Sequence, residues 1–300
     1  MKFLPMDKKK IVVRALSGAV YVAIVVSLIF LGSVGVFPLA ILFSILATIE
    51  FDRISFGGRK SAAAIACDAV ANGLMASFAG AVFVPIVLGV RFLIQLYSKS
   101  NRDKAVSSLS SSLMSVVYIG LPMMSLSLLS YIFGVYNGFV EWIAAGFASL
   151  PKLSCATLVL AMFILIWLND TGAYLVGCMC GRHKLFERVS PKKTWEGFFG
   201  GMAFCLIGAA VFYGLNDFSF PGDDVPLAVW LVYGVLVAVF ATWGDLIESM
   251  IKRNAGVKDS GNVMPGHGGI LDRIDSLLAV APMTLIYWYL IVTAVMSLNL

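Results

Sequence analysis

The chain has 300 residues, of which 60% are hydrophobic and 13% are charged, and its formal net charge is +5. Soluble domains are only about half apolar and about a quarter charged, so this composition excludes a soluble globular protein. The basic residues stand in short clusters between apolar runs, which argues against nucleic acid as a partner. We therefore expect an integral membrane protein.

Nine apolar runs are candidates for crossing a hydrocarbon core that is about 30 Å thick. They cover residues 13–31, 34–50, 62–79, 80–98, 112–134, 153–176, 196–215, 226–247 and 276–297. The predicted fold is all-α, a polytopic transmembrane bundle of about nine helices. The third and fourth runs meet without a charged residue between them, so a re-entrant hairpin is an alternative for residues 62–98.

Charge predicts the orientation, because basic residues are retained on the cytoplasmic side of a membrane. With the N-terminus in the cytoplasm, all of the 22 Lys and Arg residues except Lys152 and Arg91 fall on that side. Arg91 lies within the fourth run, from which its long side chain is expected to reach the cytoplasmic surface.

The chain divides by chemistry near residue 150. Residues 1–150 are apolar runs with short loops, and we interpret them as scaffold and lipid groove. Residues 151–300 carry polar sequence at helix ends, which predicts a transmembrane catalytic domain with a polar cavity facing the cytoplasm. Five cysteines without a paired CxxC motif and only two histidines argue against zinc, and the acidic residues favour magnesium.

The richest polar segment lies between the eighth and ninth runs. Asp245, Glu248 and Lys252 follow helical spacing and share one face, and Asp272 and Asp275 stand one turn apart where the ninth run begins. Two helix ends can thus direct carboxylates into one cavity, which suits a magnesium-bound polyphosphate. The glycine-rich sequence between them can bring backbone amides close to phosphate; a basic loop that only anchors topology is the alternative.

Two other polar segments interrupt the apolar pattern. Ser190, followed by Pro191, is interpreted as a helix start that favours anions, and Lys192 and Lys193 add positive charge for phosphate. A basic pair that only holds topology is the bland alternative. Asp170 lies inside the sixth run, where burying a charged acid costs free energy unless it faces a partner or a water-filled cavity. We expect it to face the site, and a structural pairing with Arg182 is the alternative.

These segments together resemble one enzyme family. Lys252-Arg253, Lys258-Asp259, Pro265, His267-Gly268-Gly269 and Asp272-Arg273-x-Asp275 are similar, in register, to the signature of the phosphatidate cytidylyltransferases, also called CDP-diacylglycerol synthases. Ser190-Pro-Lys-Lys-Thr-Trp-Glu-Gly197 resembles a second element of that family. Met264 replaces the more usual Leu, Ile or Phe, a volume-conserving change that alters little.

The resemblance implies the reaction of CTP with phosphatidic acid to give CDP-diacylglycerol and pyrophosphate, with Mg²⁺; whether a monovalent cation joins the magnesium is left open. It implies Asp245 and Asp272 as metal ligands. The implied catalytic residues are Asp170, Asp245, Lys258, Asp259, His267, Asp272 and Asp275. The implied substrate-binding residues are Ser190, Lys192, Lys193, Thr194, Glu196, Lys252, Arg253, Gly268, Gly269 and Arg273.

The remaining expectations concern partners and rivals. Membrane lipids are expected partners, a homodimer is left open, and the compact chain resembles bacterial members, which places it in an inner membrane with the site facing the cytoplasm. For His267 we favour hydrogen-bonded support of the loop over proton transfer, because a phosphate monoester is already largely ionised. The alternatives are a CTP-dependent enzyme that acts on another lipid phosphate or a polyprenol, a transporter of anionic solutes, and a silent scaffold.

Overall fold

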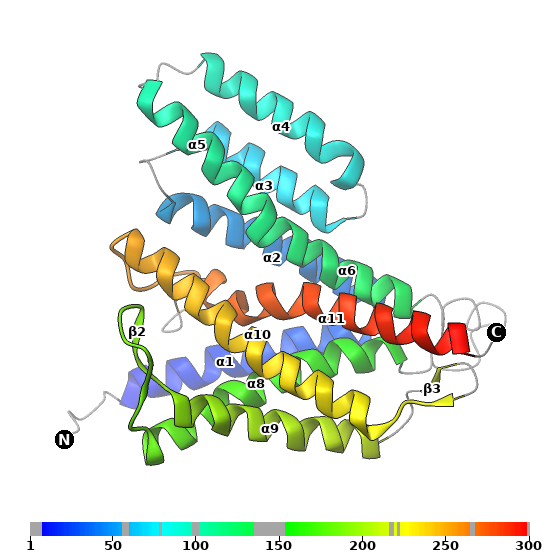
Figure 1. The fold of residues 1–300 in the computed structure, drawn as a ribbon. Helices are drawn as coiled ribbons and strands as arrows, with labels where there is room; N and C mark the ends of the chain where they lie inside the picture. Colours follow the sequence, from blue (N-terminus) through cyan, green and yellow to red (C-terminus); the bar gives the residue numbers. More distant parts are fainter. Residues whose placement is uncertain are drawn as a thin grey trace.

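The computed structural model describes residues 8–55, 60–77, 80–97, 102–134, 154–215, 219–220, 223–264 and 268–298, and in this part the chain is almost entirely helical (Figure 1). The helices are α1 (Lys8–Phe30), α2 (Ser33–Ile54), α3 (Ala62–Ala76), α4 (Gly80–Tyr97), α5 (Arg102–Ser115), α6 (Leu121–Gly134), α8 (Ser154–Cys180), α9 (Trp195–Gly214), α10 (Leu227–Asn254) and α11 (Leu271–Leu298). A π-helical turn, Val116–Gly120, joins α5 to α6 without a break.

Six helices of the described part are long and apolar enough to cross a membrane, as expected for an all-α polytopic membrane protein. Three shorter apolar helices cover Ala15–Phe30, Ala62–Ala76 and Val82–Tyr97. The third and fourth predicted runs are the separate helices α3 and α4, which pack against each other. Ser61 begins α3, because its hydroxyl accepts a hydrogen bond from the Ala64 amide at 3.2 Å.

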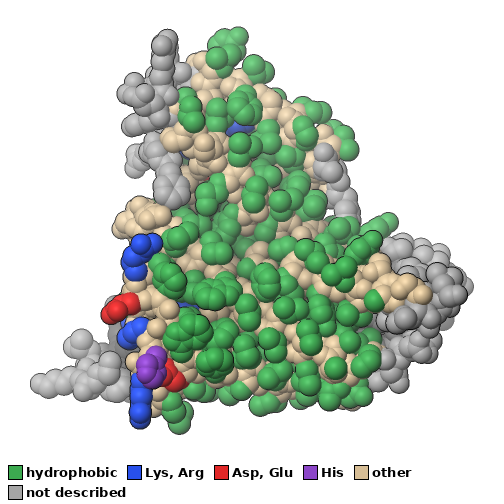
Figure 2. Space-filling view, viewed as in Figure 1, with side chains coloured by type: hydrophobic (Ala, Val, Ile, Leu, Met, Phe, Trp, Pro, Cys, Tyr) green, Lys and Arg blue, Asp and Glu red, His purple; other side chains and the backbone are tan. Residues whose placement is uncertain are grey.

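The helices form a bundle with an outer layer on one side (Figure 1). Helices α8 to α11 pack against one another, and α1 packs against α8. Helices α2 and α6 pack against α11, and α3, α4 and α5 lie beyond α2. Charged side chains gather at one end of the face that Figure 2 shows, and hydrophobic side chains cover most of the rest. A hydrophobic belt with a charged end is the pattern of a protein embedded in lipid.

Aromatic packing joins α10 to α11. Trp230 and Tyr233 on α10 and Trp288 on α11 are buried, and the rings of Trp230 and Trp288 lie 5.1 Å apart. Phe212 of α9 stacks on Trp230 with 6.0 Å between ring centroids. Because α10 and α11 run in opposite directions (Figure 1), this cluster fixes them together at the end far from Asp245.

A buried ionic network joins α2, α3 and α4. Lys60 Nζ lies 2.5 Å from Asp52 and 2.8 Å from Asp68, and Arg91 Nε lies 3.3 Å from Asp68. All four side chains are at most 2% exposed. The expectation that Arg91 reaches the membrane surface is therefore wrong, because a buried carboxylate on the neighbouring helix satisfies its charge within the bundle.

Two short antiparallel hairpins interrupt the helical pattern. The first pairs β1 (Lys184–Phe186) with β2 (Ser190–Thr194), and the second pairs β3 (Ser219–Phe220) with β4 (Asp223–Asp224). The prediction of a helix start at Ser190 is wrong, because that residue lies in β2. Helix α9 begins after Thr194, whose hydroxyl accepts a hydrogen bond from the Gly197 amide at 3.1 Å.

The buried network makes a prediction for stability. Lys60→Met leaves the carboxylates of Asp52 and Asp68 buried without their shared cation, so it should destabilise the folded state on the order of 3 kcal/mol. Thermal unfolding in detergent measures this loss. The matched control is Lys184→Met at an exposed position of β1, and equal melting temperatures for the two variants would contradict a structural role for the network.

Candidate functional site

A polar cavity of about 530 Å³ lies where the C-terminal part of α10 meets the first turn of α11. Residues of α1 and α8 complete its wall. The lining includes five of the seven predicted catalytic residues, namely Asp170, Asp245, Asp259, Asp272 and Asp275. Two predicted substrate-binding residues, Lys252 and Arg273, also line it. The tertiary structure thus gathers acids from three helices and the α10–α11 loop into one space.

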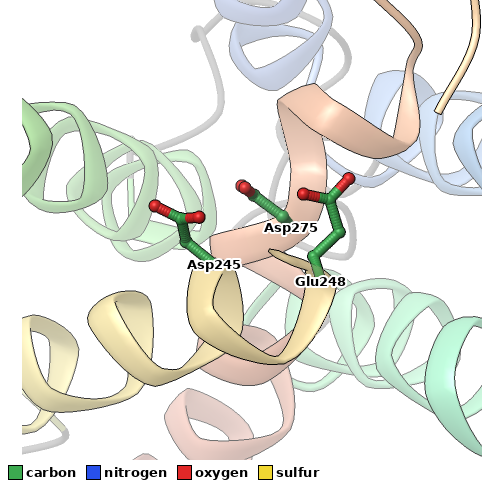
Figure 3. A group of neighbouring side chains, drawn as sticks. All are labelled: Asp245, Glu248 and Asp275. Carbon is green, nitrogen blue, oxygen red and sulfur yellow. The ribbon is translucent and has the colours of Figure 1, made fainter. Parts of the chain in front are cut away.

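Asp245, Glu248 and Asp275 form a close group of acids (Figure 3). One carboxylate oxygen of each lies within 4.8 Å of those of the others. Asp245 and Glu248 stand one turn apart on α10, and Asp275 comes from the facing turn of α11. Gly244 permits this approach, because a Cβ there would lie 2.8 Å from the Asp275 carbonyl oxygen.

Two lysines neutralise part of this negative charge. Lys252 forms ion pairs with Glu248 and with Asp272, the latter at 2.6 Å. Lys193, which comes from β2, lies 2.7 Å from Asp245. Two of the basic residues predicted to hold phosphate, Lys193 and Lys252, are therefore paired with acids at the cavity, which keeps them close to any ligand that enters it.

Asp272 holds the loop before α11. Its Oδ2 accepts hydrogen bonds from the amides of Ser260 at 3.0 Å and Gly269 at 2.8 Å. The Gly269 amide that was predicted to orient phosphate is thus directed to Asp272. Gly268, with φ of +82°, pairs with Met264 through its carbonyl oxygen, a turn in which glycine avoids backbone strain.

A second cavity of about 370 Å³ adjoins the first, and Asp170 and Asp245 line both. Lys192, Lys193 and Thr194 line the second cavity. Asp170 lies in the cavity walls and forms no ion pair with Arg182 in the described structure.

Several predicted site residues lie elsewhere. Glu196 accepts hydrogen bonds from the amides of Arg182 and His183 and lies 2.6 Å from the His183 ring, so its carboxylate holds the hairpin. Ser190, Arg253 and Lys258 line neither of these two cavities. Pro265 and His267 lie outside the described residues, as does Gly266.

Helical spacing places Glu248 on the ionic face of α10, but the family signature does not assign it to the site. It is fully buried, and its Oε1 has no hydrogen-bond partner among the described residues. The signal was its i, i+3 spacing from Asp245, and the missing information was that Asp275 lies opposite both. A buried carboxylate with a free oxygen beside two others has the donor chemistry that suits a hard divalent cation.

Comparison with known proteins finds the sequence model of the Cytidylyltransferase family matching residues 12–291. Three relatives are each named phosphatidate cytidylyltransferase. One from Staphylococcus aureus (strain COL) is 47% identical over 127 residues, covering 42% of this chain and 46% of the relative. The relative from Staphylococcus saprophyticus is 42% identical over 148 residues, covering 48% of this chain and 54% of the relative. The relative from Staphylococcus haemolyticus is 46% identical over 127 residues, covering 42% of this chain and 46% of the relative. The chain matches about half the length of these curated relatives.

The close approach of α10 to α11 can be tested at Gly244. Gly244→Ala should force the helices apart and destabilise the protein by about 1–3 kcal/mol, as overpacking does. Gly214→Ala is the matched control, because a Cβ there meets no atom within 4 Å. Thermal unfolding of both variants measures the difference, and an unchanged melting temperature for Gly244→Ala would show that the interface accommodates a methyl group.

Proposed function

Because the chain belongs to the cytidylyltransferase family, we propose that it joins CTP to phosphatidic acid, forming CDP-diacylglycerol and releasing pyrophosphate. The observation that carries this proposal is the acid-lined cavity between α10 and α11, where five residues of the signature converge, namely Lys252, Asp259, Asp272, Arg273 and Asp275. A transporter needs a path across the membrane, whereas this cavity concentrates charge at one end of the helices. The names of the relatives support the same reaction.

We propose that the cavity holds Mg²⁺. Five aspartates line it against the two cations Lys252 and Arg273, so a divalent ion would balance its charge. Asp245 was expected as a ligand from the sequence, and Asp275 and Glu248 lie close enough to share an ion with it. Asp272 is the other expected ligand, but its Oδ1 already accepts a hydrogen bond from Lys252, which a metal ion would have to displace. We therefore propose Asp275 ahead of Asp272 as a metal ligand.

The proposed reaction divides into binding and transfer. A phosphate oxygen of phosphatidic acid attacks the α-phosphorus of CTP, the bond to the β-phosphate oxygen breaks, and pyrophosphate leaves with that electron pair. A bound Mg²⁺ would supply charge neutralisation of the polyphosphate. Lys193 and Lys252, now paired with acids, would turn to phosphate oxygens once a cation occupies those acids, and Arg273 would add a third positive charge.

The lipid chains require an apolar surface next to this cavity. An apolar groove of about 450 Å³ lies between α1 and α2, with Val263, Met264 and Ile270 at its edge. Tyr21 and Met264 line both this groove and the polar cavity. We assign the groove to an acyl chain, which supports the proposed division into a lipid-binding half before residue 150 and a catalytic half after it, with α1 joining the two.

The proposed topology keeps nine crossings with the N-terminus and the site in the cytoplasm. The six long helices and three shorter apolar helices of the described part are consistent with that number. A cytoplasmic site fits a soluble nucleotide and a lipid that meet at the membrane surface, and the clustering of charge at one end supports it (Figure 2). A bacterial inner membrane belongs to the same proposal.

Labelling one phosphate of CTP distinguishes cytidylyl transfer to phosphatidic acid from the alternative CTP-dependent reactions. Purified protein with phosphatidic acid, Mg²⁺ and CTP labelled at the α-phosphate should move label into the organic phase, and γ-labelled CTP should leave its label in aqueous pyrophosphate. Lipid labelled from the γ-phosphate would instead indicate a CTP-dependent kinase. Labelling that needs a polyprenyl phosphate in place of phosphatidic acid would favour the other lipid substrate.

The metal site can be tested by substitution. Asp275→Asn and Glu248→Gln should each lower kcat on the order of 100-fold and raise the Mg²⁺ concentration for half-maximal activity, since several kcal/mol of charge stabilisation are lost. Glu187→Gln, at an exposed position between β1 and β2, is the control. Wild-type Mg²⁺ dependence in both site variants would remove Asp275 and Glu248 from the metal.

A further inference from the structure

Glu50 is a buried acid of α2 that the proposed chemistry does not use. It is 2% exposed and lies within one of the six long apolar helices. A carboxylate at such a depth costs several kcal/mol unless other groups compensate it. The compensating groups come from residues more than two hundred positions later in the chain, in the loop and first turn that carry Asp272.

Both oxygens of Glu50 bind the start of α11. Oε1 accepts a hydrogen bond from the Ile270 amide at 3.0 Å, and Oε2 accepts one from the Leu271 amide at 2.8 Å. These amides are among the donors that a helix leaves unsatisfied at its N-terminus, where negative charge is also favourable. Glu50 therefore caps α11 from a different helix and ties the first half of the chain to the site.

Ser260 links Glu50 to Asp272. Its hydroxyl oxygen lies 3.0 Å from Glu50 Oε2 and 3.0 Å from Asp272 Oδ2. It has one proton to donate, so the two carboxylates share it, while the Ser260 and Gly269 amides bind Asp272 as well. Glu50 and Asp272 thus hold the same loop from opposite sides.

Two glycines of the loop are required by this contact. A Cβ on Gly261 would lie 2.6 Å from Glu50 Oε1, and a Cβ on Gly269 would collide with Glu50 Oε2 and with the Ser260 hydroxyl. The loop is therefore fitted around the Glu50 carboxylate, and part of its glycine content follows from that fit.

We propose that Glu50 is a positioning residue: it fixes the loop and the first turn of α11 so that Asp272 and its partner Lys252 keep their places at the cavity. It lines neither of the two polar cavities and acts through the loop. The structural part of this proposal is independent of the reaction, and the kinetic part rests on the proposed cytidylyl transfer.

The structural part is tested by hydrogen exchange in detergent, which needs no substrate. Glu50→Gln keeps the shape but turns an NH₂ group toward a backbone amide that now has no acceptor. Exchange of the Ser260, Gly269, Ile270 and Leu271 amides should rise about tenfold, the equivalent of one lost hydrogen bond to a charged group, with the rest of α11 unchanged. Ser44→Ala on the same helix is the control, because the buried Ser44 hydroxyl donates no hydrogen bond in the described structure.

The kinetic part is tested in the labelled-CTP assay on the same preparations. Glu50→Gln should lower kcat about tenfold and raise the Mg²⁺ requirement, Glu50→Asp should recover part of both, and Ser44→Ala should change neither. Ser260→Ala removes only the hydroxyl that links Glu50 to Asp272, and it should also lower kcat and raise the Mg²⁺ requirement. If Glu50→Gln does not fold, this variant tests the positioning role in its place.

The outcomes separate the two proposals. Unchanged loop exchange in a folded Glu50→Gln protein overturns the positioning role, and so does a loosened loop with wild-type kcat and Mg²⁺ dependence. A loosened loop in a protein whose wild-type form transfers no cytidylyl group instead overturns the proposed function and leaves the structural role of Glu50 standing.

Discussion

The organisation of this protein depends on negative charge held inside an apolar bundle. One carboxylate oxygen from each of Asp245, Glu248 and Asp275 lies within 4.8 Å of the other two, where two long helices meet. Carboxylates repel strongly in a medium of low dielectric constant, so the arrangement requires cations close by. Lys193 and Lys252 supply two of them, from a hairpin and from α10 itself. The proposed magnesium ion would supply the remainder and would release these lysines for phosphate.

The first half of the chain contributes more than a scaffold. Helix α1 lines the polar cavity through Gly18 and Tyr21 and borders the apolar groove beside it. Helix α2 carries Glu50 into the loop before α11, and four residues of α2, α3 and α4 and the α2–α3 connection form a separate ionic network with Lys60 at its centre. Charge is thus paired in this network as well as at the polar cavity, which Asp245, Lys252 and Asp272 line.

Much of the fold could be predicted because the membrane leaves few alternatives. Helices satisfy their own backbone hydrogen bonds, so each long apolar run must be helical, and the described helices overlap the predicted runs except for α5, which lies almost entirely before the run at 112–134. The prediction failed at Ser190, where strand pairing with β1 delays the helix to Trp195. The prediction for the Arg91 side chain also failed, because its partner Asp68 lies on another helix and no local sequence pattern indicates this ion pair.

The sequence alone determined the membrane class, the family resemblance and the helical face shared by Asp245, Glu248 and Lys252, since apolar length, motif order and helical periodicity are local properties. Only the tertiary structure decided which acids meet. Glu248 joins Asp245 and Asp275 because Gly244 lets α10 approach α11, and Asp272 turns instead to Lys252, Ser260 and Gly269. Glu50 reaches its partners across more than two hundred residues, and a contact of that kind depends on how helices pack, which spacing along the chain does not encode.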